Sequence, residues 1–523
     1  MPDTVTVWEL LAGGSGESPA IDAPGRDPLD FTGLRRQVEE TVTALNRFGI
    51  GRNDRVAIVL PNGPEMASAF VSVACAATAA PLNPVYRQPE YEFYLSDLDA
   101  KAVILEFGID SPARAAAVER GIAILELCVD PEAPAGTFHL ARSRTGGNGS
   151  GSEGPENGTP AANALRGGLA EEDDVALILH TSGTTSRPKI VPLSHRNVCA
   201  SAHNVAHTLR LTAADRCLNV MPLFHIHGLI AAVLAPLRAG ASMFATPGFN
   251  ALRFYAWLDE ARPTYYSAVP TMHQAILVRA PRNRDVIERA GLRFIRSASA
   301  PLLPQVMAEL EATFGVPVIE SYAMTEAAHQ MTSNPLPPAV RKPGTVGVAA
   351  GPEVSVMAEA GRQLLPAGEV GEIVIRGANV TRGYENNPAA NAEAFTDGWL
   401  RTGDEGVMDA EGYLRITGRL KEIINRGGEK ISPREIDEAI LDHPAIRQVV
   451  AFAVPHPKLG EEVAAAAVLR LGMTATPEEI RAFAADRLAD FKVPRKILIM
   501  DDIPKGPTGK LQRIGMAEKL GLT

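Results

Sequence analysis

Along the first part of the chain, segments with the apolar spacing of a helix alternate with short apolar segments typical of strands. Residues 31–50 carry apolar side chains at helical spacing, and residues 54–63 form a short β-prone run that ends in a turn. An alanine-rich stretch, residues 64–84, predicts a helix buried on most sides, and residues 100–106 predict another strand. This alternation of strands and helices indicates a mostly parallel sheet covered by helices.

The pattern changes near Thr417, where a shorter α+β stretch begins. We expect strands there at residues 446–457, 461–470 and 495–504. We expect helices at residues 432–441 and 476–489. Each helix starts at a Ser or Thr followed by acidic residues, which is typical of a capped N-terminus. The chain is therefore divided into an N-terminal domain (1–417), a connection (418–421) and a C-terminal domain (422–523).

Composition narrows the class of protein. A chain of 523 residues is longer than one hydrophobic core usually supports, so two or more domains are expected. A content of 46% hydrophobic and 21% charged residues is ordinary for a soluble globular protein. The net charge of −10 argues against nucleic acid or an anionic membrane surface as main partner. We find no signal peptide or membrane span, and the four scattered cysteines indicate reduced, mostly buried thiols, so we expect a cytoplasmic protein. Residues 142–160, rich in Gly and Ser, predict a surface excursion.

The stretch HTSGTTSRPK, residues 180–189, suggests the chemistry. It follows the apolar strand DVALILH, residues 174–180. A strand that runs into a small, hydroxyl-rich turn can present backbone N–H groups and hydroxyls to phosphate. A Ser/Thr-rich surface loop is the alternative for this stretch taken alone.

Six further segments decide between these interpretations. They are PLFHIHGL (222–229), SASAPLLP (297–304), ESYAMTEAAHQM (320–331), WLRTGDEG (399–406), GRLKEIINRGGEKISPREI (418–436) and PKGPTGKLQR (504–513). In this order they resemble the adenylate-forming acyl-CoA synthetases, over essentially the whole chain. TSGTTSRPK, FHIHG, AMTEAAHQMTSNPLP and INRGGEKISP are similar, more narrowly, to the oxalyl-CoA synthetases of plants and fungi.

The resemblance implies a fold and a set of substrates. The fold would be α/β, with a large N-terminal domain of mostly parallel sheets covered by helices plus a β-barrel-like subdomain, and a small mobile α+β C-terminal domain. The reaction would join a carboxylic acid to coenzyme A through an acyl-adenylate, using ATP and Mg²⁺. Oxalate would be the acid.

The hydroxyl-rich turn would hold the β- and γ-phosphates of ATP. The chain departs from the commoner family pattern at Ser186 and Ile190, where Gly is usual, and at Ala323, where Gly is also usual; Ser186 is shared with the oxalate group. The residues implied to bind phosphate are Thr181, Ser182, Gly183, Thr184, Thr185 and Lys189.

Other residues resemble nucleotide contacts of the family. Tyr322 would stack on adenine, and Thr325 would contact the α-phosphate. Glu326 would bind Mg²⁺, which needs few protein carboxylates when it also bridges phosphates. Asp404 would accept both ribose hydroxyls, with Arg419 as a second ribose or phosphate contact.

The C-terminal part carries residues implied to act in two different domain poses. Lys421 would be the hinge about which the small domain rotates. Lys510 would contact the substrate carboxylate and the α-phosphate during adenylation. Gly427 and Gly428 would turn to the site after rotation and line the pantetheine channel of coenzyme A.

A small dicarboxylate needs hydrogen-bond donors at its far carboxylate, whereas a fatty or aromatic acid needs an apolar slot. The candidate donors are His225, His227, Ser299 and His329, of which His225 would lie near the carboxylate that is activated. Malonate or an aromatic acid remains open as the substrate. So do a non-catalytic nucleotide-binding protein and a module that loads a carrier protein.

Overall fold

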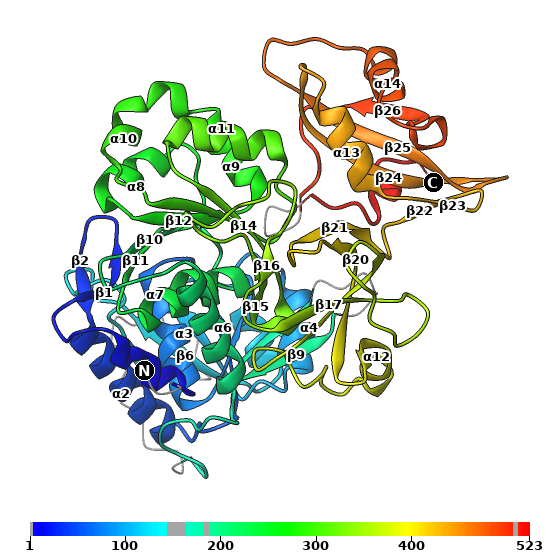
Figure 1. Ribbon diagram of the computed structural model, residues 1–523. Helices are drawn as coiled ribbons and strands as arrows, with labels where there is room; N and C mark the ends of the chain where they lie inside the picture. Colours follow the sequence, from blue (N-terminus) through cyan, green and yellow to red (C-terminus); the bar gives the residue numbers. More distant parts are fainter. Residues whose placement is uncertain (1–3, 144–163, 182–187, 506–510, 523) are drawn as a thin grey trace.

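The computed structural model describes residues 4–143, 164–181, 188–505 and 511–522. Figure 1 shows a large N-terminal body, blue to yellow, and a smaller orange-to-red domain that lies against one end of it. The predicted phosphate residues Ser182, Gly183, Thr184 and Thr185, the predicted catalytic Lys510 and most of the Gly/Ser-rich segment lie outside the described residues.

A seven-stranded sheet forms one part of the N-terminal body. Its order is β7-β6-β5-β3-β4-β8-β9, and its neighbours are parallel except for the β6–β7 and β8–β9 pairs. The strands are β3 (Arg55–Val59), β4 (Thr78–Pro81), β5 (Ala102–Glu106), β6 (Ala123–Cys128), β7 (His139–Arg142), β8 (Val175–His180) and β9 (Ile190–Ser194). Helices α4 (Gln88–Asp97) and α5 (Pro112–Glu119) pack on its outer face.

A nine-stranded sheet forms the other part, in the order β16-β15-β14-β13-β12-β10-β11-β1-β2. Its central strands are parallel, and β2, β15 and β16 are antiparallel to their neighbours. The strands are β1 (Pro19–Ala23), β2 (Arg26–Asp30), β10 (Arg216–Asn219), β11 (Ser242–Ala245), β12 (Tyr265–Ala268), β13 (Phe294–Ser297), β14 (Val318–Met324), β15 (His329–Ser333) and β16 (Val348–Ala349). Helices α8 (Phe254–Ala261), α9 (Pro270–Leu277), α10 (Arg284–Arg289) and α11 (Pro304–Phe314) cover one face (Figure 1).

Two helices lie between the sheets. Helices α3 (Pro64–Ala76) and α6 (His195–Thr208) each contact strands of both sheets, and one core cluster joins them. The remaining N-terminal helices are α1 (Val7–Leu10), α2 (Phe31–Arg47), α7 (Ala235–Arg238) and the π-helix η2 (His227–Leu234). Burial on all sides explains why α3 is alanine-rich and lacks a polar face. The prediction of mostly parallel sheets covered by helices is confirmed.

The predicted extent of the alanine-rich helix is wrong. Helix α3 ends at Ala76, Ala77 is extended, and the following residues form β4, which pairs with β3 and β8. Since residues 66–83 are all buried, the sequence shows no change of period where helix gives way to strand. Sheet pairing overrides the helix propensity of alanine.

The part of the N-terminal domain expected to form a barrel-like subdomain is an antiparallel sheet. Its order is β17-β18-β20-β19, with β21 added to β20. The strands are β17 (Glu353–Met357), β18 (Val370–Arg376), β19 (Phe395–Thr396), β20 (Trp399–Met408) and β21 (Leu414–Arg419), and α12 (Pro388–Ala394) precedes β19.

The C-terminal domain has its own sheet, in the order β23-β22-β25-β24 with β26 beside β25. Its elements are β22 (Ile424–Arg426), β23 (Glu429–Ile431), β24 (Ile446–His456), β25 (Gly460–Leu469), β26 (Lys496–Ile499), α13 (Pro433–Leu441), α14 (Pro477–Ala485) and α15 (Met516–Lys519). Thr476 caps α14 in a capping box with Glu479, as its sequence predicts. Ser432 does not cap α13, because its hydroxyl donates to the carbonyl of Thr417 instead.

The four cysteines are unpaired and buried, as their scattered spacing predicts. Burial raises the pKa of Cys75 and of Cys217, so both stay thiols at neutral pH. No helix in the described ranges combines the length and the apolarity needed to cross a bilayer.

Candidate active site

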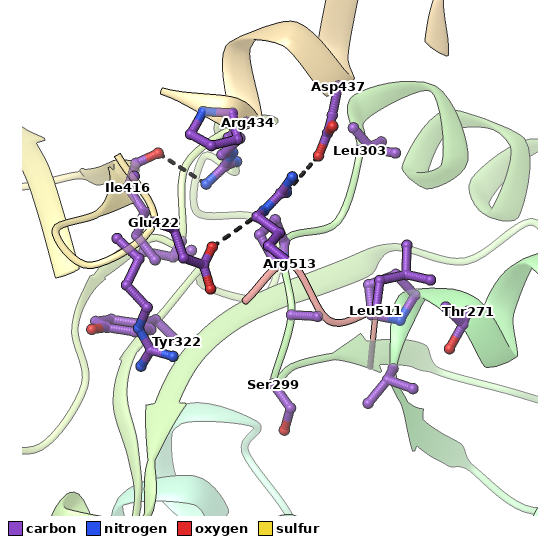
Figure 2. A pocket seen from close by; sticks show the side chains of 18 of the residues that line it. Thr271, Ser299, Leu303, Tyr322, Ile416, Glu422, Arg434, Asp437, Leu511 and Arg513 are labelled. Carbon is purple, nitrogen blue, oxygen red and sulfur yellow. Dashed lines mark hydrogen bonds and ion pairs between the residues drawn. The ribbon is translucent and has the colours of Figure 1, made fainter. Parts of the chain in front are cut away.

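A pocket of about 320 Å³ lies between the two domains (Figure 2). Its N-terminal wall comes from the ends of β13 and β14, from α9 and from β20 and β21. Its C-terminal wall comes from α13 and from the chain around Leu511 and Arg513. Parallel strands thus deliver their carboxyl ends to the cavity, which is where α/β proteins usually bind ligands.

One side of the pocket brings together Tyr322, Asp404 and Arg419. The Tyr322 hydroxyl donates to Oδ2 of Asp404, and Nε of Arg419 donates to its Oδ1 at 3.0 Å. Residues 404 and 419 are direct partners across the β20–β21 pair. The Asp404 carboxylate raises the pKa of Arg419, so the pair is firmly ionic. These three predicted nucleotide contacts form one cluster in the structure.

Glu326 and Lys189 meet at a residue that the sequence analysis missed. The Tyr384 hydroxyl donates to Oε1 of Glu326 at 2.8 Å, and Nζ of Lys189 lies 4.2 Å from the centroid of the Tyr384 ring. The main chain of Glu326 is fixed as well, since its carbonyl accepts from the N–H of Thr381 at 2.7 Å. No local pattern identifies Tyr384, because it lies 58 residues from Glu326 in the chain.

The ends of the hydroxyl-rich turn are described, although its middle is not. Strands β8 and β9 are antiparallel and pair His180 with Ile190. The N–H of Thr181 donates to the carbonyl of Lys189 at 3.0 Å, which closes the turn. Thr325 begins a short 3₁₀ turn directly after β14, with Glu326 next to it. The strand predicted before the turn is therefore present.

The chain next to Lys510 reaches the pocket. Leu511 lines the cavity together with Tyr322 and Asp404. Arg513 holds this segment in place, since it pairs with Asp437 and with Glu422, at 3.2 Å for the latter (Figure 2). The sequence analysis did not single out Arg513; its position three residues after the PTGK motif is the only local signal.

Gly427 and Gly428 are not among the residues that line the pocket. They form the turn between β22 and β23, with φ of +60° and +98°, a conformation that favours glycine. Lys421 lies exposed in the short turn between β21 and β22. The C-terminal domain therefore presents the Leu511 segment, rather than the glycine turn, to the cavity.

The acid side of the pocket gathers three of the predicted donors. Nδ1 of His227 lies 3.1 Å from Oγ of Ser299, and the rings of His227 and His329 stack at 4.9 Å between centroids. Ser299 lines the cavity and has φ of +74°, which is rare for serine, whereas both rings are fully buried. His225 is half-buried, and its Nδ1 accepts from the N–H of His227 at 3.3 Å.

Arg296 is a third residue that the sequence analysis missed. It lies on β13, fully buried, with Nη1 3.4 Å from Nε2 of His227. An arginine inside the apolar run LRFIRS was the available signal, since buried strands rarely carry one.

Comparison with known proteins identifies the family. A family model described as AMP-binding enzyme matches residues 11–385, and one described as AMP-binding enzyme C-terminal domain matches 435–510. An oxalate–CoA ligase of Arabidopsis thaliana is 43% identical over 499 residues, with 94% of each chain covered. An oxalate–CoA ligase of Saccharomyces cerevisiae is 44% identical over 483 residues, with 89% of this chain and 87% of that protein covered. The solved structure of ATP-bound MatB from Rhodopseudomonas palustris has a TM-score of 0.84 at 29% identity, and the match covers 99% of this chain and 98% of that one. The chain belongs to the AMP-binding enzyme family.

Proposed function

We propose that this protein is an AMP-forming acid–CoA ligase whose acid is oxalate. In the first step an oxalate oxygen attacks the α-phosphorus of ATP, and the bond to diphosphate breaks. In the second step the thiol of coenzyme A loses its proton and its sulfur attacks the activated acyl carbon, which releases AMP. The products are oxalyl-CoA, AMP and diphosphate.

The nucleotide would bind on the side of Tyr322, Asp404 and Arg419. Asp404 accepts from two donors already, so the two ribose hydroxyls would replace partners of similar geometry. Lys189 and the turn that it closes would face the phosphates. Thr325 would meet the α-phosphate, and Lys510 would add the positive charge that stabilises the transition state.

Mg²⁺ would be held mainly by the nucleotide. Within the described ranges there is no group of three or more His, Cys, Asp or Glu side chains suited to a metal ion. Glu326 is a buried carboxylate beside Lys189, and one such ligand fits an ion that takes its other oxygens from phosphates and water. The ion would supply positive charge to the departing diphosphate.

The oxalate assignment depends mostly on one observation. His227, Ser299 and His329 come from three separate segments; Ser299 lines the cavity, and the two buried rings lie behind it. Oxalate has no apolar surface, so its binding free energy must come from such donors. The two oxalate–CoA ligases that are similar over most of the chain support the same choice.

The second step needs a different placement of the C-terminal domain. We propose Lys421 as the hinge, because it is exposed between β21 and β22, the last strand of one domain and the first of the next. Rotation would withdraw the Leu511 segment and bring Gly427 and Gly428 to the cavity, where they would form a thin wall beside the pantetheine arm.

Release of diphosphate and AMP across a panel of acids tests the proposal. We expect oxalate to give the highest kcat/KM in a panel with malonate, acetate and 4-coumarate, and AMP release to require coenzyme A for repeated turnover. Higher kcat/KM with 4-coumarate would reject the dicarboxylate pocket and keep the ligase. A protein that binds ATP yet releases no diphosphate with any acid would be a nucleotide-binding protein without this activity.

A further inference from the structure

Arg296 is a buried cation without a carboxylate partner among the described residues. It is fully buried, and no Asp or Glu of the described chain forms an ion pair with it. Other largely buried arginines do have such partners, each at 2.6 Å: Arg52 with Asp174, Arg401 with Glu372 and Arg426 with Glu462. Burying an unpaired charge is costly, so its connection through His227 to Ser299, which lines the cavity, points to a role in function.

Among the described residues, the hydrogen-bond partners of Arg296 are a serine, a histidine and a glutamine, none of them a carboxylate. Nη1 lies 3.4 Å from Oγ of Ser267 and 3.4 Å from Nε2 of His227, and Nη2 donates to Oε1 of Gln330 at 3.2 Å. Burial lowers the pKa of Arg296 to about 10, so the side chain remains a cation at neutral pH. The positive charge is thus retained behind His227, which contacts Ser299 in the cavity wall.

The guanidinium fixes the direction of the hydrogen bonds that lead to the cavity, because it has donors only. Both Oγ of Ser267 and Nε2 of His227 then act as acceptors toward it. The Ser267 hydroxyl can donate its own proton to Nε2 of His227, at 2.7 Å. With Nε2 as the acceptor, His227 would carry its proton on Nδ1 and would donate it to Oγ of Ser299, which lies 3.1 Å away.

We propose that Arg296 is a positioning residue for the acid substrate, which acts through Ser267 and His227 to aim the hydroxyl of Ser299 at the second carboxylate. This inference rests on the proposed function. Since Oγ of Ser299 accepts from His227, its own O–H is left to donate into the cavity, which it lines. The buried charge behind this chain favours an acid that keeps a second negative charge over a monocarboxylate.

The test compares Arg296→Gln, which is neutral, with Arg296→Lys, which keeps the charge. We expect Arg296→Gln to raise the KM for oxalate about ten- to a hundredfold with little change in the KM for ATP, because a hydrogen-bonded charge of this kind contributes that much. Acetate should be affected less than threefold in kcat/KM. Arg296→Lys should recover a large part of the loss.

A measurement without substrate separates this inference from the proposed function. Nitrogen NMR of histidine-labelled protein, with His227 assigned by comparison with His227→Asn, should show the Nδ1–H tautomer in the wild type and its loss in Arg296→Gln. The Nε2–H tautomer in the wild type would overturn the inference, whatever acid the enzyme uses. Equal losses with oxalate and acetate would overturn it too.

Arg52→Gln is the matched control, because it removes another largely buried guanidinium that bonds Asp174, at the opposite end of β8 from the turn. It should lower stability without a selective change in the KM for oxalate. If Arg296→Gln does not fold, Ser267→Ala breaks the same chain and keeps the charge; a KM for oxalate unchanged in Ser267→Ala would then reject the role.

Discussion

The pocket has one side that we propose for the nucleotide (the nucleotide side) and one that we propose for the acid (the acid side), and the two hold their polar groups in opposite ways. On the nucleotide side the charges are already paired, since Asp404 bonds both Tyr322 and Arg419. On the acid side His227 joins neutral partners to Arg296, a cation that has no carboxylate in the described chain. A paired site can exchange partners when a neutral diol arrives, whereas an unpaired cation favours an anion.

The difference follows from what each ligand brings. Ribose and adenine carry no charge, so a pre-paired carboxylate loses little when its partners are exchanged for hydroxyls. A small dianion loses strong hydration when it enters the protein, and only a compensating positive charge can offset that loss.

Lys510→Ala should have the largest effect, because this lysine would touch the ligands of both sides. We expect adenylate formation to fall by at least about a hundredfold, as when one group that stabilises a transition-state charge is removed. Thioester formation from supplied oxalyl-adenylate should be spared, since Lys510 would act in one domain pose only. Rapid-quench assays of the two half-reactions measure this, and equal losses in both would contradict a two-pose mechanism.

One substitution on each side of the pocket tests whether the nucleotide and the acid bind independently. Asp404→Asn should raise the KM for ATP, and His227→Ala, which removes the group behind Ser299, should raise the KM for oxalate. Each rise should be about ten- to a hundredfold, which corresponds to a loss of roughly 1.5–3 kcal/mol. Each variant should leave the other KM within about threefold. Steady-state kinetics with one substrate varied at a time decides, and a rise of both constants in either variant would break the comparison. His329→Ala should follow His227→Ala.

Ser299→Ala should act in the same direction but more weakly. A neutral hydroxyl donor contributes about 0.5–1.5 kcal/mol, so the KM for oxalate should rise about two- to tenfold. Acetate, which lacks the second carboxylate, serves as the internal control. An effect equal to that of His227→Ala would mean that the hydroxyl, rather than the ring behind it, supplies most of the binding.

Glu320 gives the smallest effect, in stability rather than in kinetics. It lies buried on β14, two residues before Tyr322, where its Oε1 accepts from the N–H of Leu302 at 2.9 Å. Burial raises its pKa to about 7, against which the Leu302 N–H and Arg434 act in the opposite direction. The native state therefore binds this proton more tightly than the unfolded chain does.

It follows that the contribution of Glu320 is fully present below pH about 4.5 and is lost as the pH rises toward about 7. Glu320→Gln should remove this loss, so urea midpoints measured from pH 5 to 8 should diverge from the wild type as the pH increases. Glu309→Gln, at an exposed position on α11, should run parallel to the wild type. Parallel curves for Glu320→Gln would show that this carboxyl does not titrate in the window.

The sequence by itself determined the features that depend on neighbours in the chain. The strand before the hydroxyl-rich turn, the capped helix at Thr476 and the buried cysteines all follow from local pattern and composition. Asp404 and Arg419 could be expected to meet, because only a short connection separates β20 and β21. The other candidate nucleotide-binding residues were predicted from the resemblance to the family.

Only the tertiary structure decided which distant groups touch. His227 and Ser299 are 72 residues apart, and Arg296 meets His227 across 69 residues, so no local pattern links them. Tyr384 bonds Glu326 across 58 residues of the chain. Residues 78–81 form strand β4 because they pair with β3 and β8. The physical reason is that backbone propensity acts over a few residues, whereas burial and side-chain hydrogen bonding depend on which strand ends the fold places at one cavity.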